Sequence, residues 1–291
     1  MSPRTSPPSP EPERRWRRAS TSRQRVIAAR PGPDVQAAET YTLEQALEKL
    51  PETREWVRKV LRRLEPALPA AKLTVLEVGC SQGRGLVAIS ELGHTAVGVE
   101  PYRPALEVAY ELAHAEGVEI EALEGSAESI PCGSDRFDLV LAFSVLEHVS
   151  DLDATLAEIH RVLKPGGVLW FNSASAMCPV QGEIAHVPLF GWYPDRLKRR
   201  IMLWARDARP AWIGHTTTPA LHWWTPWKAR RELGNAGFVD LRDRWDLHRA
   251  EELAGARAIV IRLVRHSRLL RTIADVFIPD CSYSATKPGT R

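Results

Sequence analysis

The stretch LTVLEVGCSQGRG, residues 73–85, decides the fold that we expect for this chain. Its first half is apolar without polar alternation, which is typical of a strand buried on both faces of a parallel sheet. Gly79, Gly83 and Gly85 follow, and glycines allow a sharp turn and a close approach of a ligand to the backbone. The residues after them have a helical pattern. The stretch therefore predicts a strand, a ligand-binding turn and a helix whose N-terminal amides face the same place.

A second short apolar run ends in Glu100, which comes 21 residues after Gly79. In nucleotide-binding folds an acid at about that distance meets the ribose hydroxyls. The glycine spacing separates two kinds of cofactor. A dinucleotide fingerprint needs glycine at its first, third and sixth positions, and this chain has Gly79, Ser81 and Arg84 there. The spacing therefore argues against a dinucleotide.

Strand and helix patterns alternate from residue 73 to residue 172. We expect two helices before the first strand, the first capped by Thr42 and the second starting at Pro51, to cover the sheet beside the cofactor. The alternation predicts an α/β fold with a Rossmann-like doubly wound sheet, mostly parallel, that binds ligands at the carboxyl ends of its strands. The elements expected after Glu100 are a helix (104–116), a strand (118–123), a loop (125–131), a strand (137–143), a helix (152–163), a turn (164–167) and a strand (168–172).

The charge of the chain is unevenly distributed. Its 291 residues carry a formal charge of +3, but residues 1–34 hold eight arginines against three acids, which leaves −2 for the rest. A nearly neutral folded part argues against a nucleic-acid substrate. The Pro- and Arg-rich arm, residues 1–34, has too few apolar residues to order itself, so we expect it to be disordered rather than an anchor to an anionic surface.

The four cysteines are scattered and include no C-x-x-C pair. This spacing argues against a zinc site and against a disulfide framework. No apolar run approaches the roughly 18 to 20 residues that a membrane helix needs, and the N-terminus has no signal-peptide core. We therefore expect a cytoplasmic protein without a bound metal.

Four further motifs follow in register: SAESIP (126–131), DRFDLV (135–140), SVLEHV (144–149) and RVLKPGG (161–167). With the acid-x-Gly-x-x-x-Gly-x-Gly pattern of residues 77–85, they resemble the class I methyltransferases that use S-adenosylmethionine (SAM), in the branch that modifies small molecules and quinones. The resemblance covers about residues 73–172. It resumes at residues 224–264, where it implies a last helix and an antiparallel hairpin, 239–247 and 258–264, at the sheet edge.

The resemblance implies SAM as the cofactor and assigns residues to it. Glu77 would lie near the ammonium group, Glu100 would hold the ribose diol, and Ser126 and Ala127 would border the adenine. Phe143 and Ser144 would lie beside the methionine part, although ordinary core is an equally open interpretation of Phe143. The family usually has a glycine at the Ser81 position and often an acid at the Ser126 position. The expected cofactor-binding residues are Glu77, Gly79, Cys80, Ser81, Gly83, Glu100, Pro101, Ser126, Ala127, Glu128, Phe143 and Ser144.

The insertion between residues 173 and 223 differs most from a bare methyltransferase domain, and we expect it to be a helical lid over the acceptor. Six of the ten tryptophans fall between Phe190 and Trp227. This density favours a bulky apolar or aromatic acceptor, although the tryptophans can equally form a small core of the lid itself. A helix with Leu197, Ile201 and Trp204 on one face is also rich in Arg and Lys; a solvated charged face is its commoner explanation, and contact with a membrane is less favoured.

A hydroxyl acceptor benefits from a general base. His148 is the first candidate, His186 the second and Glu183 the third, because Glu183 and His186 would share a face if their stretch is helical. The sequence therefore predicts a SAM-dependent methyltransferase acting on a small molecule, with O-methylation favoured. A SAM- or nucleotide-binding protein without catalysis and a methyltransferase for a lipid-like acceptor at a membrane are the alternatives; the oligomeric state stays open. The expected parts are an arm (1–34), the SAM-binding core (35–172), the lid (173–223), the end of the core (224–264) and a basic tail (265–291).

Overall fold

A computed structural model describes residues 41–213, 219–248 and 255–289 of the chain. The predicted disordered arm, residues 1–34, lies outside the described residues. No helix of the described part is long and apolar enough to cross a membrane.

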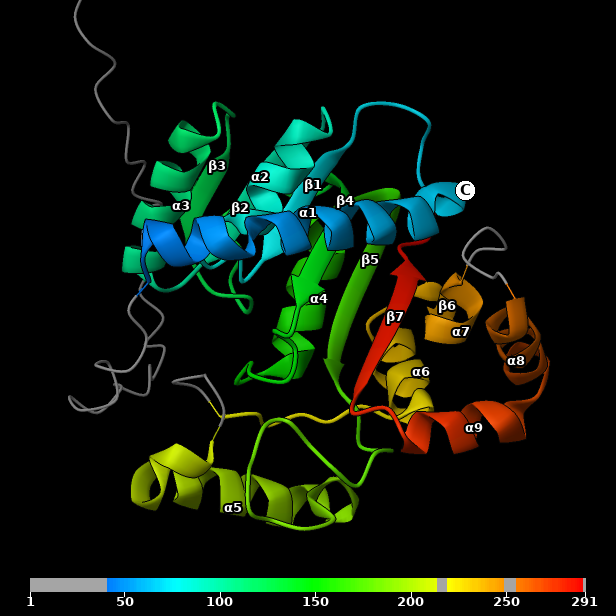
Figure 1. Ribbon diagram of the computed structural model, residues 1–291. Helices are drawn as coiled ribbons and strands as arrows, with labels where there is room; N and C mark the ends of the chain where they lie inside the picture. The colour runs from blue at the N-terminus through cyan, green and yellow to red at the C-terminus, as the bar shows by residue number, and fades with distance from the viewer. Residues whose placement is uncertain (1–40, 214–218, 249–254, 290–291) are drawn as a thin grey trace, which may run out of the picture. The chain divides into compact units, whose positions relative to one another are not determined.

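A seven-stranded sheet lies at the centre of the described part (Figure 1). Its spatial order is β3-β2-β1-β4-β5-β7-β6. The first five strands are parallel, and β7 is antiparallel to both of its neighbours. The predicted Rossmann-like sheet with an antiparallel last strand is therefore confirmed. The strands are β1 (Thr74–Val78), β2 (Thr95–Glu100), β3 (Glu121–Glu124), β4 (Phe137–Phe143), β5 (Leu163–Ala174), β6 (Val239–Asp243) and β7 (Asp280–Thr286).

Helices cover both faces of the sheet, as the unbroken apolar strands require. Val75 of β1 and Leu139 of β4 pack with side chains of α1 and α2 on one face. Leu76 and Val140, the next residues along the same strands, pack with α4 and α6 on the other. Because the first five strands are parallel, the loops that follow them lie at one edge of the sheet. The helices around the sheet are α1 (Leu43–Leu64), α2 (Arg84–Glu91), α3 (Arg103–Ala115), α4 (Leu152–Val162) and α6 (Pro226–Asn235).

The N-terminal segment forms one helix where the sequence predicted two. Thr42 caps it as expected, because its hydroxyl accepts a hydrogen bond of 3.2 Å from the Gln45 amide. Pro51, expected to begin a second helix, lies inside α1. Ala46 and Leu50 before the proline are buried against α2 and α3, and Val57 after it is buried against α2 and the sheet, so packing keeps the helix continuous across the missing amide. A short 3₁₀ turn, η1 (Glu65–Ala67), follows.

The C-terminal part corrects the predicted hairpin. The strand expected over 239–247 ends at Asp243, whose carboxylate caps the short helix α7 (Arg244–Leu247). The β-branched run 258–264, expected to be a strand, is part of helix α8 (Gly255–His266). Ala258 and Val264 are buried and Ile261 between them is partly buried, and this spacing of three residues suits one face of a helix. The antiparallel position is taken by β7, which follows helix α9 (Arg268–Val276) in the segment expected to be a tail.

The lid has a small core of its own, as the second interpretation of its tryptophans predicted. Phe190, Met202 and Trp223 are fully buried in it. Its helix α5 (Asp195–Ala208) turns its buried face inward through Met202 and Ala205, while Trp204 is half-exposed. The insertion contains the predicted helix, and its role as a lid over an acceptor stays a prediction. The rest of it is mostly irregular and includes two 3₁₀ turns, η2 (Phe190–Trp192) and η3 (Pro210–Trp212).

Candidate functional site

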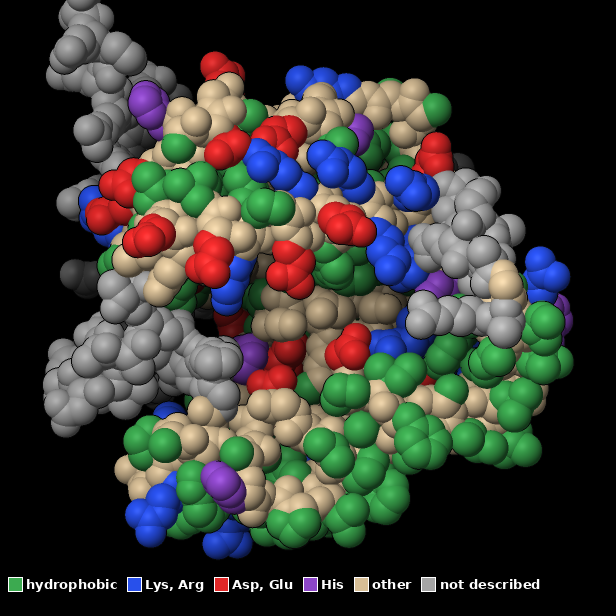
Figure 2. Space-filling view, in the orientation of Figure 1, with side chains coloured by type: hydrophobic (Ala, Val, Ile, Leu, Met, Phe, Trp, Pro, Cys, Tyr) green, Lys and Arg blue, Asp and Glu red, His purple; other side chains and the backbone are tan. Residues whose placement is uncertain are grey.

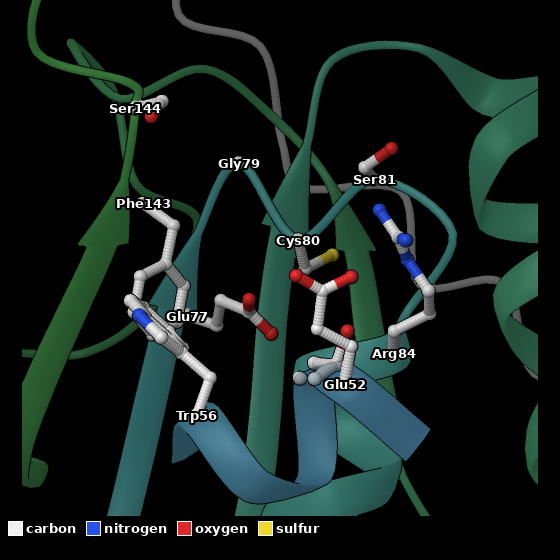
Figure 3. Close-up of a pocket in the computed structure, with 11 residues that line it drawn as sticks. Glu52, Trp56, Glu77, Gly79, Cys80, Ser81, Arg84, Phe143 and Ser144 are labelled. Carbon is white, nitrogen blue, oxygen red and sulfur yellow. The ribbon is translucent and has the colours of Figure 1, made fainter. Parts of the chain in front are cut away.

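A cavity of about 500 Å³ opens at the carboxyl ends of β1 and β4 (Figure 3). Its lining comes from three segments: α1, the glycine loop between β1 and α2, and the residues that end β4. Because the carboxyl ends of parallel strands are where ligands bind in such sheets, we take this cavity as the candidate cofactor site. The lining residues are Glu52, Thr53, Trp56, Glu77, Gly79, Cys80, Ser81, Arg84, Gly85, Phe143 and Ser144.

Two positions of the loop have no room for a side chain and therefore require glycine. Gly79 has a φ of +69°, and a Cβ on it would lie 2.5 Å from a methyl group of Val145. A Cβ on Gly85 would collide with the carboxylate of Glu77. The loop therefore brings the first turn of α2 directly against the acid at the end of β1.

Glu77 is the buried polar group of the cavity. Its side chain is 5% exposed, and its Oε2 atom has no hydrogen-bond partner among the described residues. Burial raises the pKa of Glu77 to about 8, and the negative charge of Glu100 adds to the rise while Arg84 opposes it. Figure 3 shows this carboxylate among Trp56, Cys80 and Glu52. A buried carboxylate oxygen without a partner fits a ligand that carries an ammonium group.

Glu100 is fixed at the end of β2 by the backbone. Its carboxylate accepts hydrogen bonds from the amides of Ser81 (3.1 Å) and Tyr102 (3.0 Å). The carboxylate thus lies beside the glycine loop, where a ribose would follow a methionine chain. Ser81, at the usual glycine position of the family, adopts a φ of +46°. The backbone there keeps the left-handed conformation that glycine favours.

The structure brings together half of the predicted cofactor residues at the cavity. Glu77, Gly79, Cys80, Ser81, Phe143 and Ser144 line it. Gly83 is the N-cap of α2, and Glu100 and Pro101 end β2. Ser126, Ala127 and Glu128 follow β3 outside the lining, and the Glu128 carboxylate accepts bonds from the amide and hydroxyl of Ser150 at 2.9 and 2.8 Å. Their roles toward the ribose and adenine stay predictions.

Sequence analysis missed the lining from α1 and from the start of α2. Trp56 packs its ring against Phe143, and both contact Trp170. Phe143 is therefore both a packing residue and a wall of the cavity. The signal for Trp56 was present, since the helical period placed it on the face toward the sheet. Glu52 and Thr53, one turn earlier, had no such signal, because charged and hydroxyl side chains on a helix usually face solvent.

A second carboxylate, Glu147, lies beyond the end of β4 and was not predicted. It is 2% exposed, and its Oε2 atom accepts a 2.6 Å hydrogen bond from the hydroxyl of Ser173 on β5. Its backbone carbonyl accepts from the amides of Leu221 and His222, at the end of the lid. Glu147 therefore joins the sheet to the lid. The sequence signal was an acid within the apolar run of SVLEHV, next to the histidine that attracted the prediction.

Glu147 and Glu183 influence each other across the base of the lid. Burial raises the pKa of Glu147 to about 7, and the negative charge of Glu183 adds to the rise while the bond from Ser173 opposes it. Burial also raises the pKa of Glu183. The surface is hollowed between α1 and the lid, and acidic side chains lie along the hollow (Figure 2). An acceptor in this hollow would meet acidic side chains.

The roles of the three predicted catalytic residues stay predictions. His148 lies in the turn after β4, half-buried, with its amide donating to the Val145 carbonyl at 2.8 Å. The shared helical face expected for Glu183 and His186 does not exist, because Ile184 between them pairs with Ile213 as an isolated β-bridge. His186 is exposed and stacks on Trp212 with ring centroids 5.5 Å apart.

Another histidine of the lid, His222, carries no positive charge at neutral pH. Burial, reinforced by the positive charges of Lys228 and Arg199, lowers the pKa of His222 to about 4. Its Nε2 atom lies 3.0 Å from the Val149 carbonyl, so the neutral ring ties the lid to the loop after β4. Among the described residues, no group of three or more His, Cys, Asp or Glu side chains is arranged to hold a metal ion.

A doubly wound sheet in this order, with a glycine loop and a buried acid at the end of its first strand, defines the class I methyltransferase fold. Comparison with known proteins agrees. Residues 76–171 match the family model described as a methyltransferase domain. The predicted resemblance to class I SAM-dependent methyltransferases is thus confirmed, and with it SAM as the cofactor of the domain.

The curated relatives match about two fifths of this chain. A ubiquinone biosynthesis O-methyltransferase of Dinoroseobacter shibae is 34% identical over 117 residues, which are 40% of this chain and 47% of the relative. Among solved structures, a phosphoethanolamine N-methyltransferase of Haemonchus contortus aligns with a TM-score of 0.52 at 18% identity, over 88% of this chain and 59% of its own. The [4+2]-cyclase SpnF aligns with a TM-score of 0.51 at 17% identity, over 81% of each chain. The chain thus spans about half the length of its curated relatives, and the structural likenesses show the fold.

Proposed function

We propose that this chain transfers a methyl group from SAM to an oxygen atom of a small molecule with a large apolar or aromatic part. The single observation that carries the proposal is the pairing of two buried carboxylates at one edge of the sheet. Glu77 lies in the cofactor cavity with an unsatisfied oxygen atom, and Glu147 lies beyond the neighbouring strand at the base of the lid. One suits the ammonium group of a cofactor, and the other suits a proton from an acceptor.

The residues that would hold SAM are those of the cavity and of the end of β2. Glu77 would bind the ammonium group, the glycine loop would lie against the methionine chain, and Glu100 would accept from the ribose hydroxyls. When bound there, SAM supplies a methyl group on a positively charged sulfur. Because Glu77 is protonated at neutral pH without a cation, it would lose its proton as the ammonium group arrives.

The protein's remaining task is to position the acceptor and to remove its proton. Holding two reactants in line contributes effective molarities of about 10⁵ to 10⁸ M, so much of the acceleration needs no base. A hydroxyl still becomes a better nucleophile when a base near its own working pH takes the proton. His148 is the predicted base. Glu147, with its pKa of about 7, is the alternative that this structure adds, and Glu183 beside it would respond to the same proton.

The acceptor class rests on the lid and on the relatives. The buried apolar side chains of the lid form its own core, but Leu189 and Trp192 are exposed, and apolar side chains of this kind suit contact with a ligand that has a large apolar part. The relatives' name makes an O-methylation in ubiquinone biosynthesis the first reaction to test. The full chain would be incubated with SAM and a panel of phenols with and without long apolar substituents. We expect formation of S-adenosylhomocysteine and of a methyl ether with the apolar phenols. An enzyme that binds SAM but turns over no phenol, amine or thiol of the panel would contradict the proposal.

A SAM-binding protein without methyl transfer is the second candidate. The structural likeness to a [4+2]-cyclase gives it a specific basis, because that protein shares the fold and is named for another reaction. Turnover separates the two candidates, whereas SAM binding alone does not.

A further inference from the structure

Helices α8 and α9 expose an unusual number of large apolar side chains. Seven of them are more than a third exposed, and Phe277 (78%) and Leu269 (69%) are the extremes. Isolated exposed apolar residues are ordinary, but a contiguous group on two neighbouring helices marks an interaction site. The exposed apolar residues of this surface are Ile259, Val260, Leu263, Leu269, Leu270, Ile273 and Phe277.

Helix α9 is held to the protein by its polar side. Arg271 binds the carboxylates of Asp243 and Asp246 at 2.9 and 2.8 Å. Asp275 accepts a hydrogen bond of 2.9 Å from the indole of Trp245. Arg271 and Asp275 therefore point toward the protein, and the apolar side chains of the helix are left outside. This inverted arrangement is not explained by packing within the described residues.

The positive charge of the same surface favours a negatively charged partner. Arg262, Arg265, His266 and Arg268 are exposed along the two helices. Asp275, bound to Trp245, is the only acid of the sequence between residues 255 and 279. Apolar side chains flanked by cations, without acids, are the pattern of a helix that lies in the interface of a bilayer with anionic lipids.

The position of α9 relative to the lid supports the same partner. The chain leaves α9 through Pro279, whose carbonyl accepts a 2.9 Å hydrogen bond from the Ser175 amide, where the lid begins. The lid also exposes Trp192 and Trp204, and tryptophan is favoured at membrane interfaces. Figure 2 shows apolar side chains along the lower edge of the molecule, from α5 across α6 to α9 and α8.

We propose that α8 and α9 dock this protein onto an anionic lipid bilayer, with the lid beside the lipid. The apolar side chains of the two helices would enter the interface, and the arginines would bind the lipid headgroups. The docking does not rest on the proposed methyl transfer, because vesicle binding is measured without turnover. It would also give an apolar acceptor a route from the bilayer to the hollow under the lid.

Flotation with vesicles tests the docking on the full chain. We expect binding to vesicles of 70% phosphatidylcholine and 30% phosphatidylglycerol, and weaker binding to pure phosphatidylcholine. The double variant Leu269→Glu/Phe277→Glu should lower partitioning by more than about tenfold, because it removes two side chains from the lipid and adds two repelled charges. The control Leu47→Glu/Leu92→Glu changes two residues that are each 38% exposed on α1 and at the end of α2, and it should bind like the parent.

A second variant and a second measurement keep the test decisive. Arg265→Gln/Arg268→Gln keeps the apolar surface and should lose about fivefold for each cation removed. Hydrogen exchange with vesicles should protect amides of α8 and α9 and not those of α3. Equal vesicle binding by the parent and Leu269→Glu/Phe277→Glu would overturn the proposal, since another segment would then dock. A second result would also overturn the proposal. If the parent is a dimer and Leu269→Glu/Phe277→Glu makes it a monomer without changing vesicle binding, the partner of this surface is a second copy of the chain.

Discussion

Two parts of the molecule differ in how directly the sequence specifies them. One forms the cofactor cavity, and the other forms the lid and the C-terminal helices. In the first, each residue acts through local backbone geometry: Gly79 turns the chain, and Glu100 is held by the two amides next to it. In the second, residues act through distant partners, as Glu147 does with Ser173 and Arg271 with Asp243. The comparison teaches that a motif predicts a site well where the site is built within one loop.

The largest effect is expected on the acceptor side. Replacing the general base should lower kcat by about 10² to 10⁴ while leaving SAM affinity unchanged. His148→Ala and Glu147→Gln test the two candidates. A base works in its ionised form, so if Glu147 is the base, kcat of the parent rises with pH through about 7 and that rise disappears in Glu147→Gln. A rate unchanged in both variants would remove a base near β4 from the mechanism.

The next effect belongs to the cofactor side. Glu100→Ala should weaken SAM binding by about 1 to 3 kcal/mol, because the ribose hydroxyls would lose their acceptor. Glu107→Ala, an exposed acid on α3, is the matched control and should bind SAM like the parent. Calorimetry measures both. Equal affinity of Glu100→Ala and the parent would show that the ribose lies elsewhere.

A smaller effect concerns the pH dependence of stability. The folded protein holds the Glu77 proton up to about pH 8, whereas the unfolded chain releases it near the ordinary carboxyl value. Between those two values the folded state binds more protons, so this group lowers the free energy of unfolding as pH rises. Glu77→Gln removes that loss. Its stability relative to the parent should therefore increase by about 3 kcal/mol between pH 5 and pH 8. Urea denaturation without SAM measures it, and a difference that does not change with pH would contradict the burial of an ionisable Glu77.

The smallest effect tests the unusual serine of the loop. Ser81 has a φ of +46°, which strains a residue with a side chain. Ser81→Gly should raise the free energy of unfolding by up to about 1 kcal/mol, since the relief of strain exceeds the entropy that glycine loses. Ser81→Ala keeps the Cβ and should not stabilise. If glycine destabilises the fold, the serine side chain contributes more than the backbone costs.

Much of the fold could be predicted because apolar runs and glycines report local structure. The run of β1 identified a doubly covered strand, and Thr42 identified the start of α1. The residues 258–264 could not be assigned correctly, because a β-branched run that ends on a surface helix looks like a strand. The continuity of α1 across Pro51 could not be predicted either, since it depends on burial against α2, α3 and the sheet.

The site was predictable to the same extent. The glycine loop, Glu77 and Phe143 followed from motifs and line the cavity. The helical period placed Trp56 on the inner face of its helix but not at the cavity, and Glu52 had no such signal, because only the packing of α1 brings both to the loop. Pairing Glu183 with His186 was wrong, since it assumed a helix where the chain forms a bridge between Ile184 and another part of the lid. Residues whose role depends on tertiary contacts are the ones that sequence analysis misplaced.

The most direct test of the central claim, that the cavity beside the β1–α2 loop is a SAM site, is a calorimetric titration of the full chain with SAM and, separately, with NADH. We predict saturable binding of one SAM per chain and no heat of binding with NADH, because the loop has an acid for an ammonium group and lacks the dinucleotide glycine spacing. Binding of NADH with absent or much weaker binding of SAM would contradict the account.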